Sequence, residues 1–351
     1  MKKVAYLTGT RAEFGLMKKV LKEIKADKKL NLLLMATGMH LMDEFGHTIS
    51  EVDKEFKRVE IIEAVFEKDN RESMARFLSK CITGTTEALI KLKPDVVMVL
   101  GDRSEQLAMA TAAAYLNIPI VHLHGGEITT TIDNKSRNAT TQLADWHLPA
   151  SKGAKKRLVK MGINKKNIKI VGAPGLDEIK QLSEVDKKDI IVVLQHPDEN
   201  GNKADKQIRS TLEAVIKFKL KVKIIYPNAD AGGRRQIEVI EQMAKKYPNL
   251  IEVFKNIKRD KFLRLLSEAR VLVGNSSAGL IESPSLDLPV VNIGSRQKGR
   301  EKAKSIIDVG YKKKAIEKSI SKALGMRLNN IKNPYGDGKT SARVVKFLKK
   351  I

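Results

Sequence analysis

The feature that most constrains this chain is an alternation of short aliphatic runs with longer amphipathic stretches along its 351 residues. Residues 4–8 and 30–36 predict strands, and residues 13–26 between them predict a helix with its apolar side chains on one face. A chain that alternates in this way is typical of parallel sheets joined by helical crossovers. The sequence therefore predicts the α/β class.

The same alternation continues through the rest of the chain. Further strands are predicted at residues 95–100, 118–123, 146–149, 168–171, 190–195, 222–226, 251–254, 271–274 and 290–293, and helices at 103–116, 136–144 and 341–349. The breaker cluster Gly172-Ala173-Pro174-Gly175 suits a crossover between domains. We expect two Rossmann-like domains with a central cleft, over residues 1–172 and 173–332, and a tail over 333–351 whose helix packs back on the first domain.

Composition narrows the class of protein. No apolar stretch reaches the ~18 to 20 residues of a membrane span, and the N-terminus shows no cleavage-site pattern, so we expect a cytoplasmic protein that does not bind membranes. The single cysteine, Cys81, excludes an intrachain disulfide. The net charge of +25 is spread along the chain and aromatic residues make up only 5%, so we expect no nucleic-acid partner.

Polar and charged residues follow several predicted strands, at the edge where parallel sheets collect ligands. After the first strand, a glycine turn opens a helix and presents Arg11, a pairing suited to phosphate. After the strand that ends at residue 100 come Asp102 and Arg103. Each of these turns also fits a simple helix cap, since aspartate and threonine are favoured capping residues.

The strand that ends at residue 123 carries His122 and delivers His124, twin glycines and Glu127. Because side chains alternate along a strand, both imidazoles are predicted on one face. Such a pair suits a metal, but no spacing elsewhere completes a ligand set, so we predict no metal. Asp133 is expected in a loop that follows these residues and is a candidate acid–base partner.

The second half repeats this pattern with residues suited to a nucleotide. His196 and Asn228 each follow a predicted strand. The small-residue turn with Asn275, Ser276, Ser277 and Gly279 leads into a helix, where hydroxyl and N–H groups suit phosphate oxygens. Farther along are Glu282, a candidate acceptor for ribose hydroxyls, and Arg296, a candidate cation for an anionic ligand.

Taken in order, these motifs resemble the UDP-N-acetylglucosamine 2-epimerase family, specifically its hydrolysing branch, which releases free N-acetylmannosamine and UDP. The motifs that carry the resemblance are Gly9-Thr10-Arg11-Ala12-Glu13, Gly101-Asp102-Arg103-x-Glu105, His124-Gly125-Gly126-Glu127, Tyr226-Pro227-Asn228-Ala229-Asp230, Asn275-Ser276-Ser277 and Asn292-Ile293-Gly294-Ser295-Arg296-Gln297-Lys298-Gly299-Arg300. The resemblance spans nearly the whole chain and implies a glycosyltransferase-B-like arrangement, a homodimer and no cofactor.

The resemblance also implies roles for single residues. Asp102, Asp133 and His196 would be catalytic, and His124 stands where some members have a glutamate, so it is a candidate base. Arg11, Ser276, Ser277 and Arg296 would bind the diphosphate and Glu282 the ribose, with Arg103, Glu127, Asn228, Asn275 and Gly279 also facing the substrate.

Two departures from the family's pattern bear on the substrate. These are His124 itself and Arg137-Asn138, where the family often has Arg-His. A 2,4-diacetamido-trideoxy UDP sugar is therefore an alternative to UDP-N-acetylglucosamine. A non-hydrolysing epimerase and a glycosyltransferase are alternatives within enzymes, and a nucleotide-sugar or RNA-binding protein is the alternative outside them.

Overall fold

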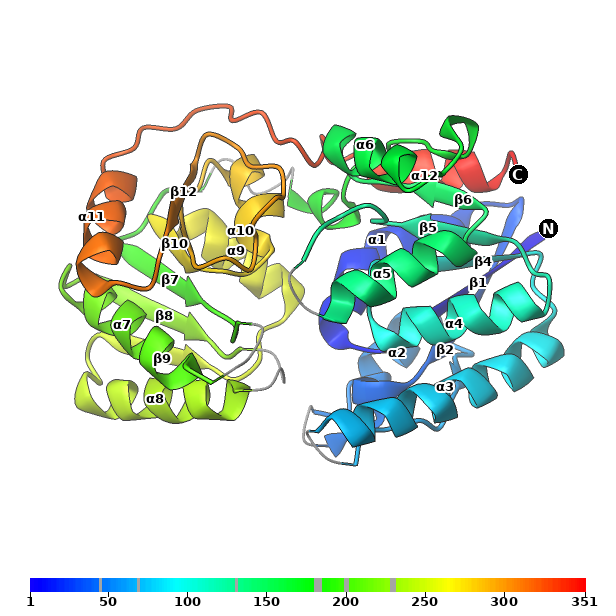
Figure 1. Ribbon diagram of the computed structural model, residues 1–351, viewed down its shortest axis with the longest axis horizontal. Helices are drawn as coiled ribbons and strands as arrows, with labels where there is room; N and C mark the ends of the chain where they lie inside the picture. Colours follow the sequence, from blue (N-terminus) through cyan, green and yellow to red (C-terminus); the bar gives the residue numbers. More distant parts are fainter. Residues whose placement is uncertain (44–45, 68–69, 130–131, 180–184, 199–201, 228–231) are drawn as a thin grey trace. The chain divides into compact units, whose positions relative to one another are not determined.

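The computed structural model describes residues 1–43, 46–67, 70–129, 132–179, 185–198, 202–227 and 232–351. These residues divide into two compact units (Figure 1). Unit 1 comprises Met1–Glu127, Ile132–Asp177 and Tyr335–Ile351, and unit 2 comprises Ile128–Thr131 and Glu178–Pro334. Each unit contains one six-stranded parallel sheet, so the predicted α/β class with two Rossmann-like sheets is confirmed.

The sheet of unit 1 has the order β3-β2-β1-β4-β5-β6. Its strands are β1 (Lys2–Thr8), β2 (Leu30–Ala36), β3 (Glu60–Ile61), β4 (Val96–Leu100), β5 (Ile120–Leu123) and β6 (Trp146–Leu148). Its helices are α1 (Arg11–Ala26), α2 (Ile49–Phe56), α3 (Arg71–Leu92), α4 (Ser104–Tyr115), α5 (Ile132–Leu143), α6 (Lys152–Lys160) and α12 (Thr340–Leu348). The chain order reverses beside β1 and β4, which is where open α/β sheets bind ligands.

The strands of unit 1 are apolar on both faces because helices cover both. Val4 and Tyr6 of β1 pack into a core with α1, α2 and α12, whereas Ala5 and Leu7 pack into a second core with α3 and α4. The period of two along the strand divides its side chains between these cores. Cys81 lies buried in the second core, where burial raises the pKa of its thiol to about 12.

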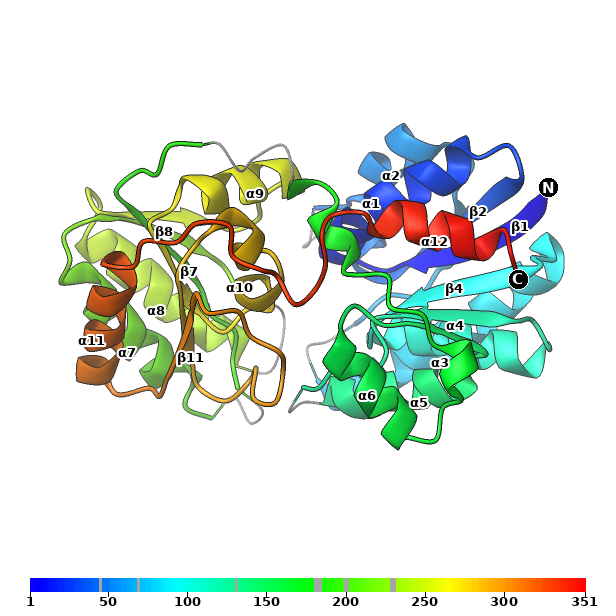
Figure 2. The ribbon, with the colours of Figure 1, turned by 90° about the horizontal axis from the view of Figure 1, so that it is seen from above.

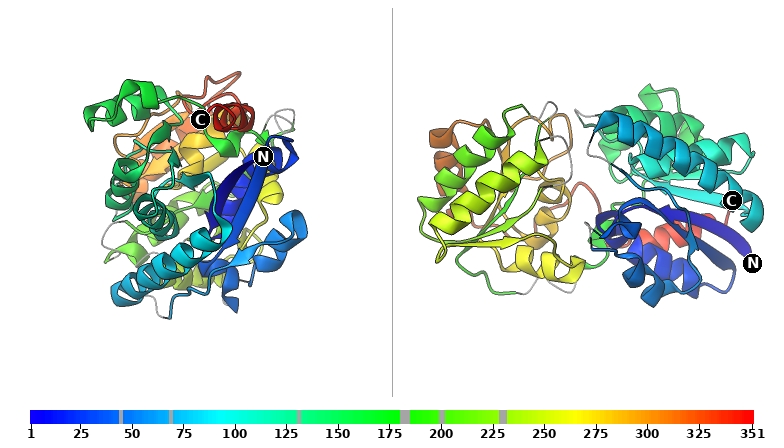
Figure 3. Two further views of the ribbon diagram at one scale, coloured as in Figure 1. Left: turned by 90° about the vertical axis from the view of Figure 1, so that its right-hand side faces the viewer. Right: turned by 90° about the horizontal axis from the view of Figure 1, so that it is seen from below.

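The sheet of unit 2 has the order β12-β11-β10-β7-β8-β9. Its strands are β7 (Ile190–Leu194), β8 (Lys221–Ile225), β9 (Ile251–Phe254), β10 (Val271–Gly274), β11 (Val290–Ile293) and β12 (Ile306–Val309). Its helices are α7 (Ala204–Ile216), α8 (Gly233–Lys246), α9 (Arg259–Glu268), α10 (Ala278–Ile281) and α11 (Lys313–Leu324). Helices α7, α8 and α11 share one hydrophobic core with the sheet, so they cover the same face of it. The yellow-green helix α8 is seen on this face in Figure 3.

The C-terminal helix α12 belongs to unit 1, where it lies beside α1 (Figure 2). Val344, Val345, Phe347 and Leu348 are buried in the same core as α1. Asp177, the last residue before the chain passes into unit 2, accepts hydrogen bonds from the main-chain N–H groups of Thr340 at 2.8 Å and Ser341 at 2.5 Å. One carboxylate thus caps the first turn of α12.

Two predictions need correction. The helix predicted for residues 136–144 is present as α5, but it begins at Ile132, so Asp133 lies in the first turn of this helix and not in a loop. An acidic side chain in the first turn interacts favourably with the helix dipole. Residues 168–171 form no strand, because only Ile168 bridges to His147. No helix among the described residues has the length and apolarity to span a bilayer.

Candidate active site

In unit 1, a carboxylate and a buried guanidinium meet at the carboxyl edge of the sheet. Asp102 follows β4 across Gly101, whose φ of 71° favours glycine. Its carboxylate forms an ion pair with Arg137 of α5, whose side chain is only 5% exposed, while that of Asp102 is 24% exposed. Arg137 also donates to the main-chain oxygen of Glu127 at 3.1 Å. The structure thus holds Asp102 by a cation that sequence reasoning did not select.

Asp133 belongs to the same site because it shares a helix face with Arg137. The two residues are four positions apart on α5, a spacing that places side chains on one face. Asp133 is half-buried, and its charge acts on Arg103. The carboxylates of Glu105, Glu13 and Asp133 together raise the pKa of Arg103 despite the opposing effect of burial.

The two histidines near β5 have different surroundings. His122 is buried, with Nε2 2.8 Å from the main-chain oxygen of Gly101 and Nδ1 3.2 Å from Oγ1 of Thr141. Burial lowers the pKa of His122 to about 3, so its imidazole is neutral at ordinary pH. His124 lies beyond the strand with φ of 59°, so the alternation that predicted both imidazoles on one face does not extend to it.

The turn between β1 and α1 lies against buried carboxylates. Glu13 accepts hydrogen bonds from the Tyr6 hydroxyl, from Oγ1 of Thr8 at 2.8 Å and from the main-chain N–H of Gly9 at 3.2 Å. Burial raises the pKa of Glu13 to about 7, although these hydrogen bonds oppose the shift. The sequence-predicted Arg11 is paired with Glu51 at 3.0 Å.

A second buried carboxylate, Glu105, lies under the same turn. Arg103 donates to its Oε1 at 3.2 Å. A Cβ added at Gly9 would lie 2.4 Å from that oxygen, so only glycine leaves room for the buried side chain. The sequence prediction assigned no role to Glu13 or Glu105. The feature that could have identified them is their position in the two sequence motifs at the starts of α1 and α4.

In unit 2, the loops after β7 and β10 are joined by Asn275. Its Oδ1 accepts from the main-chain N–H of His196 at 2.7 Å, and its Nδ2 donates to the main-chain oxygen of His196 at 2.9 Å. Arg296 donates to the main-chain oxygen of Pro197 at 3.0 Å. Three sequence-predicted residues, His196, Asn275 and Arg296, therefore lie together at the carboxyl edge of this sheet.

The predicted site residues in and after the turn that follows β10 differ in exposure. Ser276 is half-buried and Ser277, the residue before α10, is exposed. Gly279 is buried, and a Cβ there would lie 3.0 Å from Cγ1 of Val290, so this glycine serves close packing of helix on strand. Asn228 lies outside the described residues.

Glu282 follows α10, and its carboxylate is 4% exposed. Arg259, the first residue of α9, places a guanidinium nitrogen 2.8 Å from Oε1 of Glu282. This arginine was not selected from the sequence, because it lies in a polar run, Lys255 to Lys261, with no motif around it.

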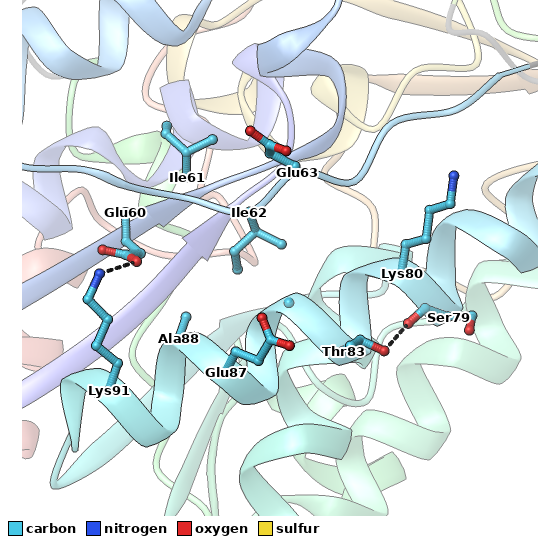
Figure 4. Close-up of a pocket in the computed structure, with 11 residues that line it drawn as sticks. Glu60, Ile61, Ile62, Glu63, Ser79, Lys80, Thr83, Glu87, Ala88 and Lys91 are labelled. Carbon is cyan, nitrogen blue, oxygen red and sulfur yellow. Dashed lines mark hydrogen bonds and ion pairs between the residues drawn. The ribbon is translucent and has the colours of Figure 1, made fainter.

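A hollow of about 580 Å³ lies between β3 and α3 of unit 1 (Figure 4). Lys91 points toward Glu60 and pairs with it at 2.7 Å, and Thr83 donates to the main-chain oxygen of Ser79. None of the sequence-predicted site residues lines this hollow. Among the described residues, no group of three or more histidine, cysteine, aspartate or glutamate side chains is placed to hold a metal ion.

Comparison with known proteins identifies one enzyme family for this chain. A sequence model described as UDP-N-acetylglucosamine 2-epimerase matches residues 22–349. The chain is 38% identical to the UDP-N,N'-diacetylbacillosamine 2-epimerase (hydrolyzing) of Legionella pneumophila, over 100% of this chain and 96% of the relative. It is 31% identical to a UDP-N-acetylglucosamine 2-epimerase of Neisseria meningitidis, over 99% of this chain and 94% of the relative.

The fold comparison agrees. The UDP-GlcNAc 2-epimerase of Methanocaldococcus jannaschii, solved in complex with UDP-GlcNAc and UDP, superposes with a TM-score of 0.84 at 20% identity, over 99% of both chains. The α/β fold read from the strand order is therefore also that of a solved protein.

Proposed function

This chain belongs to the UDP-N-acetylglucosamine 2-epimerase family, and from that premise we propose that it hydrolyses a UDP-2-acetamido sugar to UDP and the free sugar epimerised at C2. The observation that carries the proposal is the ion pair of Asp102 with buried Arg137, beside Asp133 on the same helix face. Asp102 and Asp133 supply carboxylates near the place where the strand order of this sheet reverses, which is where open α/β sheets bind ligands. A reaction at a pyranose ring requires such carboxylates.

The reaction is proposed in two steps. In the first, the C1–O bond breaks with its electron pair leaving on UDP, and the proton at C2 passes to a base, which leaves a glycal. In the second, water adds its hydroxyl to C1, and a proton returns to C2 on the opposite face. The net change consumes one water, releases UDP and requires no redox cofactor.

The groups of unit 1 fit these steps. A C2 proton beside a neutral amide carbon is weakly acidic, so C1–O cleavage runs ahead and develops positive charge on the ring, as in glycoside hydrolysis. We assign the stabilisation of that charge to Asp102, whose own charge is balanced by Arg137. Asp133 and His124, both half-buried, are assigned to proton transfer.

The groups of unit 2 fit the nucleotide. Ser276 and Ser277 at the start of α10 offer hydroxyl and N–H groups for the diphosphate, and Arg296 adds a cation. Glu282 is assigned to the ribose hydroxyls, and His196 to contact with the leaving diphosphate. Stabilisation of that leaving group would lower the barrier to C1–O cleavage.

Of two sugars, we propose UDP-N,N'-diacetylbacillosamine as the preferred substrate and UDP-N-acetylglucosamine as the second candidate. The relative whose printed name contains the first sugar is 38% identical to this chain, against 31% for the relative whose name contains the second. His124 and Asn138 are the positions at which the sugar site departs from the family's usual pattern.

The test is incubation with each UDP sugar in deuterated water, with release of UDP and the free sugar followed by NMR. We expect free sugar carrying deuterium at C2, and a higher kcat/KM for the diacetamido substrate. An intact mixture of UDP-sugar epimers would instead identify a non-hydrolysing enzyme. Sugar transfer that requires an acceptor would identify a glycosyltransferase, and a higher kcat/KM for UDP-N-acetylglucosamine would reverse the substrate order.

A further inference from the structure

The carboxylate of Glu282 in unit 2 is held by one guanidinium. Nη1 of Arg259 lies 2.8 Å from Oε1 of Glu282, and the two side chains are 18% and 4% exposed. A carboxylate this buried has little water to orient it, so its partner decides which way its oxygens point.

The guanidinium is itself fixed on two further sides. Its Nε lies 3.8 Å from Oε2 of Glu178, and its central carbon lies over the ring of Phe262 at 5.8 Å. Phe262 is three positions along α9, so helix geometry places its ring beside Arg259. An arginine with restricted rotamers is able to hold a carboxylate in one orientation.

The contact leaves Glu282 able to accept more hydrogen bonds. A carboxylate has acceptor positions for about four hydrogen bonds, and the ion pair brings one nitrogen of Arg259 to Oε1. Two vicinal hydroxyls of a ribose need two of the remaining positions. The pair therefore orients the carboxylate without using up its capacity.

We propose that Arg259 is a positioning residue for nucleotide specificity, which holds Glu282 in the orientation that accepts the ribose hydroxyls of the UDP sugar. This inference rests on the proposed function. It predicts that the preference for a ribose with both hydroxyls depends on a residue that does not itself touch the ribose.

The test compares the binding of UDP and 2′,3′-dideoxyuridine 5′-diphosphate to the full chain by calorimetry. The wild type should prefer UDP by at least about tenfold, because hydrogen bonds to a charged group are lost in the analogue. Arg259→Met should reduce this preference to below about threefold, mainly by lowering the affinity for UDP. The affinity for the analogue should stay within about threefold of wild type.

The matched control is Arg264→Met. Arg264 lies on the same helix and pairs with Glu268 at 3.1 Å, but its side chain is 71% exposed. This variant should keep the wild-type preference, so any general effect of removing a paired arginine from α9 is accounted for.

Two further variants keep the test decisive if Arg259→Met does not fold. Arg259→Met leaves the buried carboxylate of Glu282 without this ion pair, and the double variant Arg259→Met with Glu282→Gln removes that charge. The preference of the double variant for UDP over the analogue should equal that of Glu282→Gln alone. Arg259→Lys, which keeps the cation but loses the planar fork, should give an intermediate preference.

The outcomes separate the two proposals. Equal losses for UDP and its analogue in Arg259→Met and Arg259→Lys, or an unchanged preference in both, would overturn the positioning role. A wild-type chain that binds neither UDP nor its analogue would instead overturn the proposed function.

Discussion

The guanidinium of Arg137 is almost fully buried against the carboxylate of Asp102, which remains about one quarter exposed. The pair is therefore asymmetric. Loss of Arg137 would leave a carboxylate that water can reach, whereas loss of the charge on Asp102 would remove the counterion of a cation in the interior. The second change is the more costly, because less water reaches the buried cation to replace the lost carboxylate.

We therefore expect Asp102→Asn to lower the free energy of unfolding by about 3 kcal/mol and Arg137→Met by about 1 kcal/mol. Under the proposed function, Asp102→Asn should also lower kcat by at least about 100-fold. Denaturant unfolding and steady-state kinetics measure the two effects. A larger loss of stability for Arg137→Met would contradict the asymmetry.

The second prediction concerns the pH dependence of stability through Glu13. Its pKa is raised from 4.5 to about 7 in the folded protein, mainly by burial. The folded state therefore binds a proton more tightly than the unfolded state, and this stabilisation is complete below pH 4.5 and is lost as the pH rises to about 7. Relative to Glu13→Gln, the wild type should lose about 3 kcal/mol across that window.

Urea unfolding of both proteins at several pH values measures this difference. Glu72→Gln, at a side chain that is 72% exposed on α3, is the control for the same substitution at an exposed position. A difference between wild type and Glu13→Gln that does not change with pH would show that burial does not raise the pKa of the Glu13 carboxyl.

The third prediction concerns Gly9. An alanine Cβ there would meet three side-chain atoms of Glu105 within 2.4 to 2.5 Å, and Glu105 is fully buried. We expect Gly9→Ala to lower the free energy of unfolding by about 2 kcal/mol through overpacking. Gly310→Ala, whose Cβ would meet nothing within 4 Å, should change it by less than about 0.5 kcal/mol. Thermal melts of the two variants should therefore separate clearly, and coincident melts would show that Glu105 moves aside at little cost.

The fourth prediction concerns Asn275. Asn275→Ala removes both hydrogen bonds to the buried main chain of His196, so we expect a loss of about 2 kcal/mol in stability and, under the proposed function, a lower kcat. Asn249→Ala, at an exposed position, should change neither. Stability measurements and UDP-release kinetics test this, and an unchanged Asn275→Ala protein would mean that another contact fixes the loop.

The sequence predicted the strands well where apolar runs are continuous. The predictions at residues 251–254, 271–274 and 290–293 agree with β9, β10 and β11 to the residue. The prediction at 168–171 failed although Ile168, Ile170 and Val171 are β-branched, because the segment makes one isolated bridge within unit 1, between Ile168 and His147. Propensity describes a residue, whereas a strand also needs a partner.

The sequence by itself determined the α/β class and the positions of Asp102 and His196 after strands, because the period of apolar residues and the turn chemistry are local. Only the tertiary structure decided which cations hold the carboxylates of the candidate site, since Arg137 meets Asp102 and Arg259 meets Glu282 across separate elements. It also decided that His122 is a neutral, buried side chain. Such pairings depend on burial and on distances through space, which spacing along a chain does not encode.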